Sequence, residues 1–253
     1  MKKCLHFNFS DAVRLVDFFA LGMFGERLFD LYGRENVVSD TAKVLDDMTR
    51  LMEESGYGEY SSKLSSSVGN SYNLIKNILI SDAKSIFEND PAANSVEEVI
   101  YCYPGFFAIF CHRIAHILYE CEIPMLPRLI SEYAHSMTGI DIHPGAQIGE
   151  GFSIDHGTGI VIGETAQIGK GVSVYQGVTI GAKTIPHNRK LACGESEKRH
   201  PTVKDGCRIY ANALVLGSDT VIGENSVIGA GVMVTQSVPE NTVLTYTKQK
   251  NNS

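Results

Sequence analysis

A histidine that directly follows an aspartate offers the clearest chemistry in this sequence. His156 follows Asp155, and Asp141 lies 15 residues earlier in the chain. A carboxylate beside an imidazole fixes its tautomer and raises its basicity, which suits a general base that takes a proton from a hydroxyl. We therefore predict that His156 is a general base and that Asp141 orients it. The spacing alone leaves open the alternative that these are exposed corner residues without a catalytic role.

Histidine and cysteine also allow other chemistries, which the pattern favours less. The region after residue 137 holds four of the eight histidines: His143, His156, His187 and His200. Three histidines from a trimer could bind zinc, but none of these forms a tight pair, so we expect no metal. His112 and His116 stand at i and i+4 without an evident third ligand, which favours a structural role. A nucleophilic Cys193 or Cys207 would need an adjacent base. We therefore favour chemistry that does not pass through a covalent intermediate on a cysteine.

A period of six residues determines where these groups lie. Branched apolar residues occupy one register: Ile142, Ile148, Ile154, Ile162, Ile168, Val174, Ile180, Val203, Ile209, Val215, Ile222, Ile228 and Val234. Such hexads predict short parallel strands wound into a triangular prism, with about 18 residues in each coil. The register slips by two residues after Ile154 and by one after Val215, so we expect functional bulges there. The first slip contains His156.

The largest break in the register lies between Ile180 and Val203. We predict an extruded loop over residues 182–202, which is rich in charged side chains. Loops that leave a rigid scaffold commonly carry binding and catalytic residues. Arg199 and His200 stand at the end of this loop.

The first half of the chain has apolar residues at helical spacing. We predict amphipathic helices up to residue 137, with an interruption at residues 56–58 and at the serine-rich stretch 61–67. Ser95 and Glu98 have the form of a capping box at the start of one helix, and Pro104 begins another. The fold class is α+β: an all-helical domain over 1–137, then a left-handed parallel β-helix of hexapeptide repeats over 138–240. A short C-terminal tail follows over 241–253.

Composition excludes several classes of function. The formal net charge is −7, which makes the chain a poor partner for nucleic acid. No apolar stretch reaches the roughly 20 residues of a membrane span, and the N-terminus lacks the pattern of a secretory signal. The six cysteines contain no C-x-x-C pair, which indicates reduced thiols and a cytoplasmic protein.

Three segments of the β-helix resemble the serine O-acetyltransferase family of hexapeptide-repeat acyltransferases: residues 141–144 (DIHP), 154–166 (IDHGTGIVIGETA) and 199–201 (RHP). Three segments of the helical half are similar as well: residues 90–92 (DPA), 104–106 (PGF) and 113–116 (RIAH). The resemblance covers roughly residues 68–240. It implies transfer of acetyl from acetyl-CoA to the hydroxyl of L-serine, giving O-acetyl-L-serine for cysteine biosynthesis. An acetyltransferase for another small hydroxyl or amino acceptor is the alternative, and a non-catalytic scaffold is a third reading.

The resemblance also implies roles for individual residues. His156 would be the base and Asp141 its orienting partner. Carboxylates would hold the ammonium of serine and basic groups its carboxylate: Asp90 and Asp155 for the ammonium, Arg199 and His200 for the carboxylate. Small residues would line the groove for the pantetheine arm of acetyl-CoA: Gly181, Ala182, Ala211 and Ala230.

Assembly and regulation follow from the same resemblance. The family forms homotrimers with active sites between neighbouring prisms, and two trimers pair into a hexamer. L-cysteine inhibits by occupying the serine site. The tail at 241–253 lacks the Pro-Ala-Arg segment and the terminal isoleucine that docks into O-acetylserine sulfhydrylase. We therefore expect cysteine to compete with serine, with weak coupling to coenzyme A, and no stable sulfhydrylase complex through the C-terminus.

Overall fold

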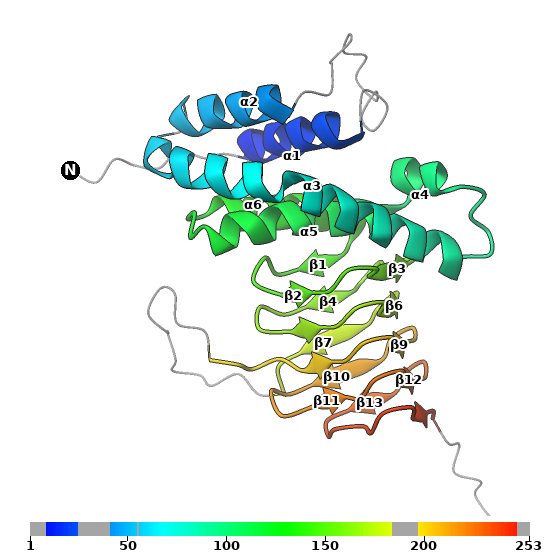
Figure 1. The fold of residues 1–253 in the computed structure, drawn as a ribbon. Helices are drawn as coiled ribbons and strands as arrows, with labels where there is room; N and C mark the ends of the chain where they lie inside the picture. The colour runs from blue at the N-terminus through cyan, green and yellow to red at the C-terminus, as the bar shows by residue number, and fades with distance from the viewer. Residues whose placement is uncertain (1–8, 25–40, 55, 184–196, 247–253) are drawn as a thin grey trace, which may run out of the picture.

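The computed structural model describes residues 9–24, 41–54, 56–183 and 197–246. Six helices in these ranges precede the strands: α1 (Phe9–Phe24), α2 (Thr41–Glu54), α3 (Gly58–Asn89), α4 (Val96–Cys102), α5 (Pro104–Glu120) and α6 (Leu126–Thr138). The helices cover the end of the coil that begins with β1, with α3, α5 and α6 against the coil and α1 and α2 farthest from it (Figure 1). No helix in the described ranges has the length and apolarity to cross a membrane.

Helix α3 runs through the serine-rich stretch that we predicted to interrupt it. The hydroxyl of Ser61 donates to the carbonyl of Gly58 at 2.7 Å, and that of Ser66 to Lys63 at 2.9 Å. Hydroxyls that bond back to the preceding turn leave the backbone ladder intact, which is why the predicted break was wrong. The predicted cap of α4 is confirmed, since the amide of Glu98 donates to the Ser95 hydroxyl at 3.1 Å.

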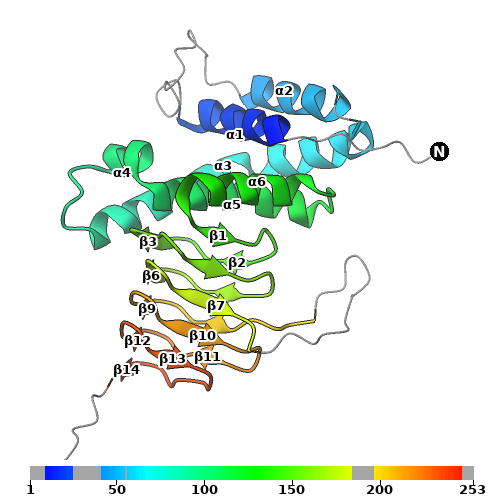
Figure 2. The ribbon, with the colours of Figure 1, turned by 180° about the vertical axis from the view of Figure 1, so that it is seen from behind.

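The second half is a parallel coil with three faces. Face A contains β1 (Asp141–Ile142), β4 (Val161–Ile162), β7 (Thr179–Gly181), β10 (Leu214–Leu216) and β13 (Met233–Val234). Face B contains β2 (Gln147–Ile148), β5 (Gln167–Ile168), β8 (Thr202–Val203) and β11 (Val221–Ile222). Face C contains β3 (Ser153–Asp155), β6 (Ser173–Tyr175), β9 (Arg208–Ile209), β12 (Val227–Ile228) and β14 (Val243–Leu244). The stack is seen from behind in Figure 2.

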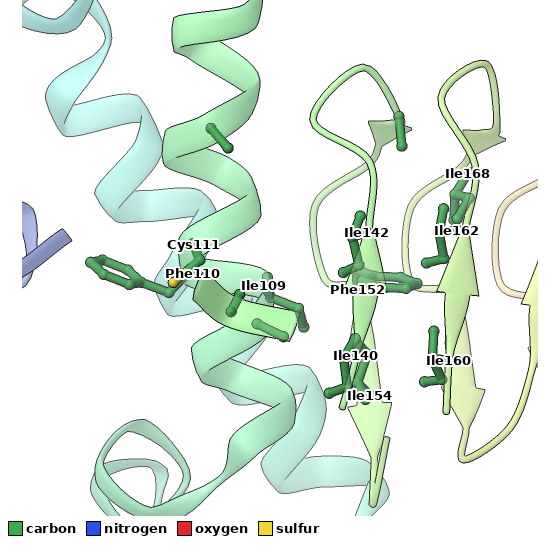
Figure 3. Close-up of a cluster of buried hydrophobic side chains, with 14 of the residues drawn as sticks. Ile109, Phe110, Cys111, Ile140, Ile142, Phe152, Ile154, Ile160, Ile162 and Ile168 are labelled. Atoms are coloured by element: carbon green, nitrogen blue, oxygen red, sulfur yellow. The ribbon is translucent and has the colours of Figure 1, made fainter. Parts of the chain in front are cut away.

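The branched residues of the predicted register form the interior of this coil. Twelve of the thirteen are at most 5% exposed, and Ile148 is partly buried against the core. Figure 3 shows Ile142, Ile154 and Ile162 among the side chains inside the prism. The two-residue slip after Ile154 is absorbed by left-handed backbone, with φ of 58° at His156. The apolar column therefore continues through the slip.

An ion pair joins the helical half to the coil. Asp82 of α3 and Arg113 of α5 are buried and paired at 3.1 Å. Arg113 donates to the carbonyls of Ile148 and Gly149, while Asp82 accepts the amide of Phe152 at 2.9 Å. Burial raises the pKa of Asp82 against the opposing influence of Arg113. The bonds from this pair to the coil hold the helices at a fixed position over the first coil. Removing either partner would leave a buried charge unpaired.

The change from helix to coil falls between Thr138 and Asp141. At the other end, β14 pairs with β12 through Val227 and Val243, so the coil extends past residue 240 into the segment predicted as a tail. The division into 1–137, 138–240 and 241–253 otherwise stays a prediction. Residues 184–196 of the predicted loop and 247–253 of the tail lie outside the described ranges.

Candidate active site

The predicted site residues lie on two edges of the coil. The chain turns from face C to face A at residues 156–160, and we call this the His156 edge. It turns from face A to face B at residues 163–166, and His200 precedes β8 on face B at the same edge, which we call the His200 edge. The strands of face A separate the two edges.

The His156 edge brings two predicted carboxylates to the predicted base. The imidazole of His156 is 72% exposed, and its Nε2 lies 3.8 Å from Oδ1 of Asp155. Asp90 follows α3 and accepts the Tyr103 hydroxyl at 2.6 Å and the Ala92 amide at 2.8 Å. These bonds, of which that from Tyr103 is the stronger influence, lower the pKa of Asp90, and His156 contributes to the same shift. The edge therefore presents negative charge beside an accessible imidazole.

Tyr103 was missed in the sequence, although it touches this carboxylate cluster directly. Its hydrogen bond to Asp90 is the largest cause that raises its pKa to about 12, and the charge of Asp155 adds to the shift. Tyr103 stands between α4 and α5, directly before Pro104. No motif marks it, because its contact with Asp90 depends on how the two helices turn. Its hydroxyl remains a donor throughout the ordinary pH range.

Asp141 begins β1 at the same edge, one coil from His156. Its amide donates to the carbonyl of Ile160 at 2.9 Å, which ties it to the segment that follows His156. Within the described ranges, no hydrogen bond or ion pair joins the carboxylate of Asp141 to the imidazole. The predicted orienting role of Asp141 therefore stays a prediction.

The His200 edge holds the predicted basic pair in a network of hydrogen bonds. Arg199 forms an ion pair with Glu164, and the other carboxylate oxygen of Glu164 accepts the hydroxyl of Tyr119 at 2.9 Å. Burial acts to raise the pKa of Glu164, but the bonds from Arg199 and Tyr119 hold it below its usual value. His200 is only 6% exposed, and burial lowers its pKa to about 4. His200 is thus uncharged at neutral pH.

Residues predicted to bind one substrate are therefore divided between two edges of the chain. Asp90, Asp155 and His156 meet at one edge, and Arg199 and His200 at the other. The predicted groove residues divide in the same way. Gly181 and Ala182 lie at the His200 edge, after face A, while Ala211 and Ala230 lie at the His156 edge, after face C.

An aromatic pair lies between the acidic cluster and these alanines. Asp155 is paired with Tyr175 in the register of face C, and the ring of Tyr175 stacks on Tyr210 at 4.9 Å. Ala211 directly follows Tyr210. The surface at the His156 edge therefore passes from carboxylates to aromatic rings and then to small residues, an order that suits a polar acceptor followed by a slender, largely apolar arm.

The alternatives to general-base chemistry find little support in the described ranges. Cys207 is buried and its thiol lies 3.0 Å from the carbonyl of Gly223, as expected of a core residue. The rings of His112 and His116 lie 5.7 Å apart, and His116 is bonded to the carbonyl of Pro144. No group of three or more potential metal ligands occurs among these residues. His187 and Cys193 lie outside the described part.

Comparisons with known proteins place the chain among serine acetyltransferases. No family model matches the chain. A plasmid serine acetyltransferase of Synechococcus elongatus is 45% identical over 181 residues, which are 72% of this chain and only 56% of that relative. The serine acetyltransferase of Bacillus subtilis is 51% identical over 163 residues, 64% of this chain and 70% of the relative. The crystal structure of serine acetyltransferase isoform 3 from Entamoeba histolytica, in complex with cysteine, matches with a TM-score of 0.77 at 33% identity, covering 94% of this chain and 84% of that one.

The structural match identifies the coil as the left-handed β-helix of hexapeptide-repeat acyltransferases, so the predicted fold class is confirmed. The sequence identities carry the assignment one step further. The chain belongs to the serine acetyltransferase family.

Proposed function

We propose that the chain is a serine O-acetyltransferase, which transfers the acetyl group of acetyl-CoA to the hydroxyl of L-serine in cysteine biosynthesis. The observation that carries the proposal is the grouping of Asp90 and Asp155 beside the accessible imidazole of His156. Two carboxylates beside a base suit an acceptor that carries an ammonium group near its hydroxyl. A sugar hydroxyl would have no use for them.

In this proposal His156 acts as the general base. The carboxylates of Asp90 and Asp155 hold the ammonium, which directs the serine hydroxyl toward the imidazole. As His156 takes the hydroxyl proton, the oxygen attacks the thioester carbonyl of acetyl-CoA, and the imidazolium returns the proton to the departing sulfur. A positioned base contributes about 10² to 10⁴ in rate. Asp141 is proposed to orient the imidazole.

The carboxylate of serine is proposed to bind Arg199 and His200 of a neighbouring copy. Both half-sites flank face A, whose outer surface exposes apolar side chains, with Val161 at 39% and Met233 at 64% exposure. Association through this face would remove them from water and bring the His156 edge of one prism to the His200 edge of the next. We propose a homotrimer on this ground, and pairing of trimers into a hexamer from the family resemblance alone.

Acetyl-CoA is the proposed acetyl donor, and its pantetheine arm would lie against Gly181, Ala182, Ala211 and Ala230. Their division between the two edges supports a groove between neighbouring prisms. L-cysteine carries the same ammonium and carboxylate as serine, so it is the proposed inhibitor, and the related Entamoeba histolytica enzyme crystallised with cysteine bound. The prediction about sulfhydrylase rests on the tail, of which 247–253 lie outside the described ranges, and it stays a prediction. We keep the cytoplasm as the proposed location, where thiols such as Cys111 and Cys207 stay reduced.

Release of free thiol from acetyl-CoA tests the activity. Serine should be acetylated in preference to a panel of sugars, amines and other amino acids, with O-acetyl-L-serine identified as the product. Turnover of a different acceptor and none of serine would favour the alternative, a hexapeptide-repeat acetyltransferase for another small hydroxyl or amino group. No turnover with any acceptor would favour a scaffold. Light scattering at the assay concentration tests the trimer, which a mass of 27.7 kDa would contradict.

A further inference from the structure

Three consecutive residues at the corner between β4 and β5 hold the segment that carries Arg199 and His200. These residues are Gly163, Glu164 and Thr165. Glu164 pairs with the guanidinium of Arg199. A Cβ on Gly163 would lie 2.1 Å from Nε2 of His200, so the imidazole rests against the backbone at that position. Within the described residues, the further hydrogen bonds of the segment go to Thr165.

Thr165 bonds to three successive residues of the segment 198–200. Its hydroxyl oxygen accepts the amides of Arg199 at 2.9 Å and His200 at 3.1 Å. Its carbonyl accepts the ammonium of Lys198 at 3.1 Å. Its own amide donates to Nδ1 of His200 at 3.0 Å, and its hydroxyl lies 2.9 Å from the same nitrogen. One side chain and its backbone therefore set both the path of the segment and the rotation of the imidazole.

The amide of Thr165 also determines the tautomer of His200. A backbone amide can only donate, so Nδ1 must be the acceptor and the ring hydrogen must lie on Nε2. Burial and the charge of Arg199 keep the ring neutral at pH 7. His200 thus offers one N–H donor and no charge. The guanidinium of Arg199, and not the imidazole, is the charged partner for the carboxylate of an acceptor.

The contacts with Gly163, Glu164 and Thr165 matter because the segment 198–200 is not itself part of a strand. It directly precedes β8, whose first residue is Thr202, and it follows the long insertion after β7. Its backbone lies outside the sheet ladders, whereas Thr165 lies within a closed corner of the coil, where Ala166 is fully buried. This corner can therefore position a segment that the sheet ladders do not hold.

We propose that Thr165 is the positioning residue of the acceptor site, whose hydroxyl fixes Arg199 and His200 for the carboxylate of the acceptor. The inference rests on the proposed function and adds a residue to it.

The test compares Thr165→Val, which keeps the shape and removes the hydroxyl, with Thr165→Ser, which restores it. We expect Thr165→Val to raise KM for serine about tenfold with little change in KM for acetyl-CoA, since two backbone bonds are lost. Thr165→Ser should retain most of the affinity. Thr202→Val is the matched control, because the hydroxyl of Thr202 bonds only to the exposed side chain of Gln167 at 3.1 Å. It should leave both constants unchanged.

A second readout does not depend on turnover. In ¹⁵N-histidine-labelled protein at pH 7, the His200 signals, assigned by their loss in His200→Gln, should show an unprotonated Nδ1. Thr165→Val keeps the amide at residue 165 but loses the two hydroxyl bonds that hold the segment 198–200 in place, so the imidazole should no longer stay against that amide and a mixture of tautomers should appear. Thr165→Ser should keep the single tautomer. Unchanged KM for serine together with an unchanged tautomer in Thr165→Val would overturn the positioning role. If the unaltered protein does not acetylate serine, the proposed function fails, and the tautomer spectra alone then decide whether Thr165 positions His200.

Discussion

The two edges of the prism differ in how firmly they hold their functional groups. At the His156 edge the imidazole is exposed, and its Nε2 lies 3.8 Å from the carboxylate of Asp155. At the His200 edge the imidazole is buried and bonded to Thr165, while Arg199 is paired with Glu164. A base must gain and lose a proton in each turnover, whereas a binding group must keep one protonation state and one orientation. The difference supports the proposal that the first edge carries the proton transfer and the second edge the fixed recognition of the acceptor.

The ionisation of the two edges follows the same division. Hydrogen bonds lower the pKa of Asp90, so the His156 edge stays negatively charged. Burial lowers the pKa of His200 to about 4, so the positive charge at its edge comes from Arg199 and Lys198 and not from the imidazole. A zwitterion bound between two such edges meets an opposite charge at each end. Because face A separates the two edges, the two proposed halves of the site do not meet within one chain.

The largest expected effect is on the base. His156→Ala should lower kcat about 10² to 10⁴-fold, because the proton of the hydroxyl then has no positioned acceptor. The melting temperature should barely change, since the side chain is mostly exposed. Turnover of serine measured beside His135→Ala, which alters a half-exposed histidine of α6, gives the control. Full activity in His156→Ala would remove the proposed distinction between the edges.

Mixing two inactive variants tests whether the halves of the site come from different copies. His156→Ala damages one edge and Arg199→Ala the other, so each variant alone should be nearly inactive. In a trimer assembled at random from equal amounts, about a quarter of the interfaces would join two intact edges. Purification through two affinity tags removes the homotrimers, and one of the three interfaces in each mixed trimer joins two intact edges, so about a third of the activity per interface should be restored. Absence of any recovery in the doubly tagged assembly would contradict a site shared between chains.

Tyr103→Phe should have a moderate effect at the His156 edge. Losing the 2.6 Å bond to Asp90 should raise KM for serine a few-fold, in line with about 1 kcal/mol for one hydrogen bond. The pKa of Asp90 lies below the ordinary value of 3.8 largely through this bond, so it should rise toward that value. Asp90 would then become protonated at a higher pH on acidification. The acid limb of kcat/KM for serine should move to higher pH, and an unmoved limb would exclude this role of Tyr103.

Tyr119→Phe should have the smallest effect, although it removes an equivalent bond at the His200 edge. Glu164 would keep Arg199 as a partner, so the carboxylate is still held. We expect less than a twofold change in KM for serine, measured in the same assay as Tyr103→Phe. A larger loss than in Tyr103→Phe would show that the His200 edge is less firmly fixed than its hydrogen bonds indicate.

The sequence was informative about the coil because one physical requirement repeats. Every sixth position must fill the prism, so the branched register located the strands, and only Ile148 is incompletely buried. The helices followed from apolar spacing and from the cap at Ser95. The break predicted within α3 was wrong because serine hydroxyls there bond to the preceding turn, as Ser61 does.

The site was predictable in its residue types and less so in its arrangement. Counting hexads in threes from Ile142 puts His156 after a face C strand and His200 before a face B strand, so the division between edges was present in the register. The roles of Tyr103 and Thr165 could not be predicted from the sequence. Their contacts depend on how α5 meets α3 and how the chain returns from its insertion, and neither geometry has a local signature.

Helix α5 carries a consequence for engineering. Tyr103 precedes its first residue and bonds to Asp90 at one edge, while Tyr119 in its last turn bonds to Glu164 at the other. In a ring of copies, each α5 would therefore touch two different active sites. A chimaera that exchanged the helical half of a relative without its coil would misalign both at once, so the useful unit of exchange is α3 to α5 together with residues 141–166.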